Sequence, residues 1–252
     1  MTDFTGYKIF AKVFLWFVLI YVVLFQFILP FNSLFPAPSI MFYAIGDLFT
    51  KYNFASALGF TTLAVIFIPI GGFACFYLTK APFMKLFLKY DFRWLENAFR
   101  FFPYMFFIFI LAIWTGDSFW GEVIALMLFA GLEQKSAMAK TIRVVPSHFS
   151  LFAKSAGLSD YQIYDKIYGK LMLPYTIEKI GNLFLIGWVY AFVYEMVSGN
   201  YGVGNIILQT IKYGDSSAFF LIILIMIIVI YLFGLFFKFI QYKVVKWIPD
   251  EF

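Results

Sequence analysis

Long uncharged stretches divide the chain into segments whose lengths match the thickness of a lipid bilayer. A helix needs roughly 20 mostly apolar residues to cross the hydrocarbon core of a membrane. On this criterion the sequence predicts an all-α, polytopic membrane protein with six transmembrane helices in one domain over residues 1–252. These helices are expected at residues 13–29, 54–78, 98–114, 118–132, 177–198 and 216–237. The segments between them are predicted as connections, and the longest covers residues 133–176.

The composition supports this class and excludes others. Hydrophobic residues make up 63% of the chain and charged residues 13%, about half the usual share of roughly 25% in soluble proteins. A water-soluble domain cannot bury that much apolar surface, and disorder requires low hydrophobicity and high charge. A soluble enzyme and a disordered chain are therefore excluded. The single cysteine, Cys75, excludes an internal disulfide, and the single histidine, His148, argues against a histidine-based metal site.

Lysine and arginine are distributed unevenly over the predicted connections. Fifteen of the 19 lie in the N-terminal segment, in the connections after spans two and four, or in the C-terminal tail. Only Lys51 and Lys212 lie in the alternate connections. Because cytoplasmic loops carry an excess of Lys and Arg, both termini and the two basic loops are predicted to be cytoplasmic. The first span is expected to be an uncleaved anchor, because its apolar run is too long for a signal peptide.

The net charge of +5 follows from this topology. Basic residues beside membrane spans contact the anionic headgroups of the lipid bilayer. A nucleic-acid partner is therefore not needed to explain the charge.

The connection at 133–176 is too long to be a simple turn, since loops above roughly 12–15 residues usually form structure or carry function. Its sequence predicts two short helices. The first starts near Ser147, a candidate N-cap, and ends at Gly157 as a C′ glycine. The second starts at Ser159 as N-cap and is stopped by Pro174, which lacks the amide donor of a helix interior.

The second of these helices has an apolar stripe formed by Ile163, Ile167 and Leu171, four residues apart. An apolar face on a cytosolic helical hairpin must be buried against something. It either packs on the membrane spans of the same chain or docks to a cytosolic partner.

Residues 153–174, "AKSAGLSDYQIYDKIYGKLMLP", resemble the "EAA" coupling loop of the permeases of binding-protein-dependent ABC importers. Two features depart from that motif: Leu151 replaces its acidic residue, and the stretch from Gly157 to Pro174 is about one helical turn longer. A second alignment places residues 155–157 on Glu-Ala-Ala and Tyr161 on the glycine. The matching positions in the first alignment are Ala153, Gly157, Ser159, Gln162, Tyr164, Ile167, Leu171, Leu173 and Pro174.

Three further segments resemble the nitrate/sulfonate/taurine branch of this family. They are "FPAPS" at 35–39, "FRFFPYMFFIFILAIWTGDSFWGEVI" at 99–124 and "VYEMVSGNYGVGNII" at 193–207. The resemblance implies a permease subunit in the bacterial inner membrane, paired with a second copy or a paralogue. It also implies two further partners, a cytosolic ABC ATPase and an extracytoplasmic substrate-binding protein.

In such importers the loop helix sits in a groove on the ATPase, so the resemblance assigns coupling to the 146–174 loop. To transmit movement of the ATPase to the membrane spans, the loop helix needs an apolar or aromatic contact face. Tyr161, Tyr164 and Ile167 can provide this face. ATP is expected to bind to the partner, because the chain has no Gly-x-x-x-x-Gly-Lys-Ser/Thr motif. No cofactor or metal is expected in this chain. The residues assigned to coupling are Ala153, Gly157, Ser159, Tyr161, Gln162, Tyr164, Ile167 and Pro174.

Five residues are candidates for the transport pathway or its gate. Ionisable side chains in membrane spans are costly and often functional, so Glu122 and Glu195 predict an acidic outer vestibule; the alternative is interfacial solvation. Gly202 and Gly204 follow Glu195 and are expected in a turn with unusual backbone angles. Pro69, followed by two glycines, predicts a kink in span two, with either a gating or a purely packing role.

Other function classes fit less well. An intramembrane enzyme lacks the residues it needs, because the chain has one histidine and no Gly-x-Ser-x-Gly motif. A channel or a scaffold subunit of a membrane complex remains as the alternative, since six spans with basic loops are not diagnostic. The sequence therefore predicts a non-enzymatic permease that moves a small solute, whose identity it does not specify.

Overall fold

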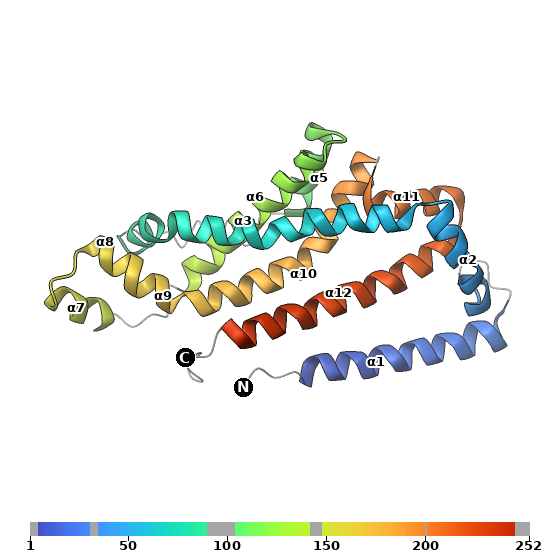
Figure 1. Cartoon of the computed structure of the whole chain (residues 1–252), viewed down its shortest axis with the longest axis horizontal. Helices are drawn as coiled ribbons and strands as arrows, with labels where there is room; N and C mark the ends of the chain where they lie inside the picture. Colours follow the sequence, from blue (N-terminus) through green and yellow to red (C-terminus); the bar gives the residue numbers. More distant parts are fainter. Residues whose placement is uncertain (1–4, 31–34, 90–103, 142–147, 200, 245–252) are drawn as a thin grey trace.

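The computed structural model describes residues 5–30, 35–89, 104–141, 148–199 and 201–244. Every regular element within these ranges is a helix, which confirms the all-α class. Four long helices, the first of them continued by a π-helical turn, run along the long axis of the molecule (Figure 1). They are α1 (Thr5–Val22) with η1 (Val23–Ile28), α3 (Phe54–Lys89), α10 (Leu173–Ser198) and α12 (Ser216–Val244).

Shorter helices complete the chain and mark the two ends of the molecule (Figure 1). The α7 end carries α7 (His148–Ser155), α8 (Asp160–Gln162), η2 (Ile163–Tyr168) and α9 (Gly169–Leu171). The opposite, α11 end carries α2 (Pro38–Thr50) and α11 (Gly202–Tyr213). Between them, α5 (Tyr104–Thr115) and α6 (Phe119–Thr141) rise from the long helices.

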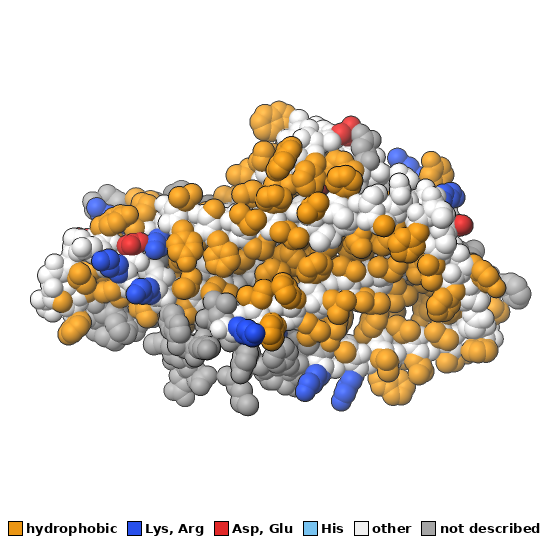
Figure 2. Space-filling view, in the orientation of Figure 1, with side chains coloured by type: hydrophobic (Ala, Val, Ile, Leu, Met, Phe, Trp, Pro, Cys, Tyr) orange, Lys and Arg blue, Asp and Glu red, His pale blue; other side chains and the backbone are white. Residues whose placement is uncertain are grey.

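Within the described part of the chain, four helices are long and apolar enough to cross a membrane, and they correspond to predicted spans one, two, five and six. The third span lies in α5, a short apolar helix of 12 residues, while residues 98–103 fall outside the described part of the chain. The fourth span lies in α6, which continues to Thr141. The count of six therefore stays a prediction. Figure 2 shows hydrophobic side chains over the middle of the molecule and a group of Lys and Arg at the α7 end.

Two helices occupy segments that the sequence analysis treated as connections. In α2, Pro38 stands in the first turn, and Met41, Ala44 and Leu48 are buried. Proline is favoured in a first helical turn because the amide it lacks would have no partner there. α2 has 13 residues and α11 has 12, which is too few to span a bilayer. A search for long apolar runs therefore misses both helices.

α10 lies at the centre of the core and packs against α3, α5, α6, α11 and α12. The helix α3 continues through Pro69, and the two glycines after it lie against neighbouring helices. A Cβ atom on Gly71 would lie 3.0 Å from Met127 Cβ of α6, and one on Gly72 would lie 3.0 Å from Ile180 Cγ1 of α10. Small residues let helix backbones approach closely in membranes, so this segment has a packing role. A gating role for Pro69 stays a prediction.

At the α11 end, a hydrogen-bonded contact joins the start of α3 to the start of α12. The Tyr52 hydroxyl donates to Asp215 Oδ2 at 3.0 Å, and the Ala218 amide donates to Asp215 Oδ1 at 3.0 Å. Burial alone would raise the pKa of Asp215, but hydrogen bonds from Ala218, Ser217 and Tyr52 outweigh it and lower this pKa. Burial and the bond to Asp215 raise the pKa of Tyr52 to about 12. The contact joins α3 to α12, and both of these helices pack against α11.

Candidate functional site

The coupling segment, residues 148–172, begins with α7 and reverses direction at Gly157. Gly157 has a φ of +79°. Its amide donates to the Lys154 carbonyl at 3.0 Å, and the Leu158 amide donates to the Ala153 carbonyl at 3.1 Å. This pair of bonds is the Schellman motif, which confirms Gly157 as a C′ glycine. The proposed N-cap Ser147 lies outside the described residues.

Ser159 starts the second helix of the segment with a capping box. The Gln162 amide donates to Ser159 Oγ at 3.4 Å, and the Ser159 amide donates to Gln162 Oε1 at 3.0 Å. Two helix-end amides are thus satisfied reciprocally. The predicted N-cap is confirmed, and Gln162, assigned to coupling, has a structural role in the same turn.

We expect Gly157→Ala to loosen this turn, because a left-handed residue with a Cβ costs about 1–2 kcal/mol. The surrounding space is open, so no steric term adds to this cost. Hydrogen exchange of the amides at 153–160 should become about tenfold faster, since 1.4 kcal/mol corresponds to a factor of ten. Gly59→Ala, at an open position on α3, is the control and should leave this exchange unchanged. Unchanged exchange in Gly157→Ala would contradict the prediction.

The buried stripe of the second helix differs from the predicted one. The structure buries Ile163, Tyr168 and Met172, whereas the predicted members Ile167 and Leu171 are only partly buried. The reason is η2, a π-helical stretch from Ile163 to Tyr168. Its i→i+5 hydrogen bonds place residues five apart, not four apart, on one face. The predicted stripe is therefore confirmed at Ile163 and wrong after it, because the spacing is five across η2 and returns to four between Tyr168 and Met172.

The buried face of the coupling segment packs on the membrane helices of the same chain. Its cluster joins Phe76 of α3 and Met138 of α6 to residues of the segment. An ion pair between Lys80 Nζ and Asp165 Oδ1, 2.8 Å long, fixes the segment to α3. The members from the segment are Ala153, Ile163, Tyr168 and Met172, with Tyr164 and Ile167 packed against them. The stripe is thus covered within the chain, as the first of the two alternatives expected.

The residues assigned to coupling fall into a buried group and an exposed group. Ala153 is buried, and burial raises the pKa of Tyr164, which packs against the same cluster. Pro174 is also buried, in the first turn of α10. The preceding helix does end before Pro174, because α9 ends at Leu171, but a new helix, α10, begins at Leu173 and carries Pro174 in its first turn.

Three large apolar side chains of the segment are exposed. Tyr161 is 65% exposed, Leu151 66% and Phe152 76%. Of the aromatic residues assigned to coupling, Tyr161 alone is exposed in this way. The sequence analysis noted Leu151 only as a departure from a motif and missed Phe152. Ala153 could have indicated their exposure. If Ala153 faces the core, its neighbours Leu151 and Phe152 on the same helix point in other directions.

At the α11 end, the Glu195 carboxylate holds the start of α11. Thr61 Oγ1 of α3 donates to Glu195 Oε1 at 2.5 Å, and the Gly204 amide donates to Glu195 Oε2 at 2.7 Å. The Val203 amide in turn donates to Thr61 Oγ1 at 2.9 Å. A carboxylate is favoured at a helix N-terminus, where it meets free amides and the positive end of the helix dipole. Three helices are thus joined at one fully buried side chain.

The glycines after Glu195 are required by this arrangement. Gly199 and Gly202 have φ angles of +82° and +81°, which confirms the predicted turn with unusual backbone angles. A Cβ on Gly202 would overlap the Glu195 carboxylate. One on Gly204 would lie 2.9 Å from Phe192 Cα and closer still to the Phe192 carbonyl oxygen.

Neither predicted vestibule glutamate is solvated in this chain. Glu122 and Glu195 are both 0% exposed. Among the described residues, neither carboxylate oxygen of Glu122 has a hydrogen-bond partner. The expectation of interfacial solvation is therefore wrong for both. The Tyr201 hydroxyl is the polar group that interacts with this carboxyl. Because a buried carboxyl in a membrane span is costly, Glu122 stays a candidate for the pathway.

The fold and these two sites define the class of the protein. Apolar helices long enough to cross a membrane, with an intervening helical segment fixed to them at the α7 end, are typical of a polytopic membrane protein. The chain belongs to the family described as binding-protein-dependent transport system inner membrane component, whose model matches residues 83–248. It is thus a multi-pass inner-membrane protein and the permease component of a binding-protein-dependent ABC transporter, a type that works with an ABC ATPase and a substrate-binding protein. No curated protein and no solved structure matches the chain.

Proposed function

We propose that the chain is the permease subunit of an ATP-driven importer of a small solute, coupled to a cytosolic ATPase through the coupling segment. The observation that carries this proposal is the exposed apolar face of Leu151, Phe152 and Tyr161. Its other face is fixed to α3 and α6. A surface that holds three large apolar side chains in water, on a braced support, is typical of a protein–protein contact.

The brace explains how force on the segment would reach the membrane. With 36 residues, α3 is roughly 54 Å long at 1.5 Å per residue, whereas the hydrocarbon core is about 30 Å thick. The segment contacts α3 at Phe76 and Lys80, near the end of its apolar stretch. A second ion pair, Lys179–Glu133 at 2.8 Å, joins α10 to α6 beside it. Movement of the segment would therefore tilt α3, α6 and α10 together.

In this proposal the ATPase binds ATP, and the permease itself holds no cofactor. The coupling segment and both termini face the cytoplasm, while the α11 end faces outward and receives the substrate-binding protein. A second permease, identical or paralogous, completes the pathway. The nitrate/sulfonate/taurine branch stays a prediction, because the family match does not distinguish between branches.

The candidate pathway residues take different parts in the proposed cycle. Glu195, Gly202 and Gly204 fix α11 at the outer end of the bundle, so α11 moves with α3 and α10. Glu122 and Pro69 are proposed to lie along the route that opens when these helices tilt. Family membership favours this transport function over the alternative of a channel or scaffold subunit.

The double variant Phe152→Ala/Tyr161→Ala tests the coupling proposal. Aromatic residues at the centre of an interface cost at least about 2 kcal/mol when truncated, so ATPase binding should weaken at least about 30-fold. The measurement is the dissociation constant between the purified permease in nanodiscs and an ABC ATPase that copurifies with the wild-type protein from its host. Lys170→Ala, an exposed change elsewhere in the segment, should bind as wild type does.

Unchanged ATPase binding by a folded double variant would reject this face as the coupling surface. If the wild-type permease binds no ATPase at all, the channel or scaffold alternative would gain support.

A further inference from the structure

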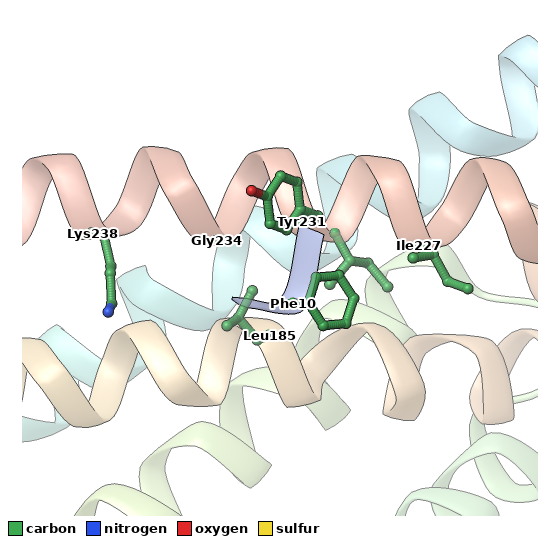
Figure 3. Close-up of a pocket in the computed structure, with 7 residues that line it drawn as sticks. Phe10, Leu185, Ile227, Tyr231, Gly234 and Lys238 are labelled. Atoms are coloured by element: carbon green, nitrogen blue, oxygen red, sulfur yellow. The ribbon is translucent and has the colours of Figure 1, made fainter. Parts of the chain in front are cut away.

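A groove separates α1 from the rest of the molecule. No described residue of α1 is buried, whereas half of the apolar window of α10 is. One cavity of about 420 Å³ lies between α1, α10 and α12 (Figure 3). A second, of about 400 Å³, lies further along α1 and α12, and both are lined by Ile227. The first is lined by Phe10, Leu185, Ile227, Ile230, Tyr231, Gly234 and Lys238.

The walls of this α1–α12 groove are almost entirely hydrocarbon. Water needs two to four polar partners in a buried site, and the groove offers very few. In a bilayer the material available to fill such a space is the acyl chain of a lipid. The groove has the elongated form that such a chain requires, since its two cavities follow each other along α12.

One end of the groove is cationic. Lys238 lines it and points from α12 towards α10 (Figure 3). Lys8 and Lys12 near the start of α1 add positive charge at the same end of the two helices. The described residues of α1 and α12 include no Asp or Glu.

We propose that the α1–α12 groove is a binding site for an anionic phospholipid. One acyl chain lies between α1 and α12, and the phosphate lies at Lys238. Basic pockets between membrane helices bind anionic headgroups in this way. A second copy of the chain docking through the same two helices would place lysines next to lysines, and these would repel each other. A lipid phosphate carries the opposite charge, so charge complementarity favours a lipid as the occupant. The bound lipid then connects α1, which makes few contacts of its own, to the core. This inference does not depend on the ATPase.

The test is a titration of the delipidated full-length protein with phosphatidylglycerol in detergent, read by native mass spectrometry. Wild type should bind one phosphatidylglycerol in preference to phosphatidylcholine. Lys238→Ala should weaken phosphatidylglycerol binding about fivefold, the effect expected for one lysine near a headgroup. Lys243→Ala is the matched control, because Lys243 lies on the same helix over the Phe239 ring and does not line the groove. It should bind nearly as wild type does.

A second pair of variants tests the groove without touching charge. Ile227→Trp places a large side chain in both cavities and should abolish the preferred binding of one lipid. Ile228→Trp, at a position 46% exposed on the outer surface of α12, should leave it intact. Equal binding of phosphatidylcholine, or equal effects of the two lysine variants, would overturn the proposal. So would a lipid-free dimer that Ile227→Trp dissociates, because a second copy would then occupy the groove.

Discussion

Glu195→Ala is expected to lower the free energy of unfolding by about 2–3 kcal/mol, the range for removing a buried hydrogen bond to a charged group. The Gly204 amide loses its acceptor, and the fully buried site offers no water to replace it. Thr61 loses one of its two acceptors but keeps the Ala57 carbonyl at 3.1 Å. The measurement is the thermal midpoint of the purified protein in nanodiscs, followed together with solute uptake.

Glu195→Gln is the control for size and hydrogen bonding. Its amide oxygen can still accept from Gly204 and its nitrogen can donate to Thr61, so the loss should stay within about 1 kcal/mol. Because Thr61 and Glu195 are in contact, Thr61→Val combined with Glu195→Ala should cost less than the sum of the single changes. A glutamine variant that folds normally but transports nothing would show instead that the negative charge itself acts in the pathway. An alanine variant as stable as wild type would reject the anchor.

The sequence predicts well those features that depend on neighbouring residues. Gly157 and Ser159 were identified as helix punctuation because a C′ glycine and a serine N-cap work through bonds within four or five residues. The long apolar helices were found for the same reason, since each one satisfies its own backbone in lipid. Their positions follow from the composition of single stretches of chain.

Features that depend on contacts between distant segments were predicted less well. The partner of Glu195 is Thr61, 134 residues away, so its anchoring role is not visible in the local pattern. The predicted stripe of the coupling segment is wrong by one position after Ile163, because the π-helical stretch from Ile163 to Tyr168 shifts the buried face by one residue. The exposure of Tyr161 and the partial burial of Tyr164 likewise depend on contacts with distant segments, so the local sequence does not predict them.

The second large effect is expected for Gly204→Ala, which should destabilise the protein by about 3 kcal/mol or more, at or above the upper end for an overpacked site. The new Cβ would meet the Phe192 backbone of α10. A flexible side chain could move aside, but a helix backbone inside a packed bundle cannot. We expect little folded protein in the membrane fraction, measured as the monodisperse peak after extraction in mild detergent.

Gly199→Ala separates this steric effect from backbone strain. Gly199 lies in the same turn with a φ of +82°, but nothing lies within 4 Å of its Cβ position. Its replacement should cost only the left-handed term of about 1–2 kcal/mol, so folded protein should remain. If Gly204→Ala is instead as well folded as Gly199→Ala, α11 must be able to move away from α10. The junction would then be a hinge and not a fixed anchor, and its glycines would belong to the gate, because a helix that can leave its neighbour at low cost can also do so during transport.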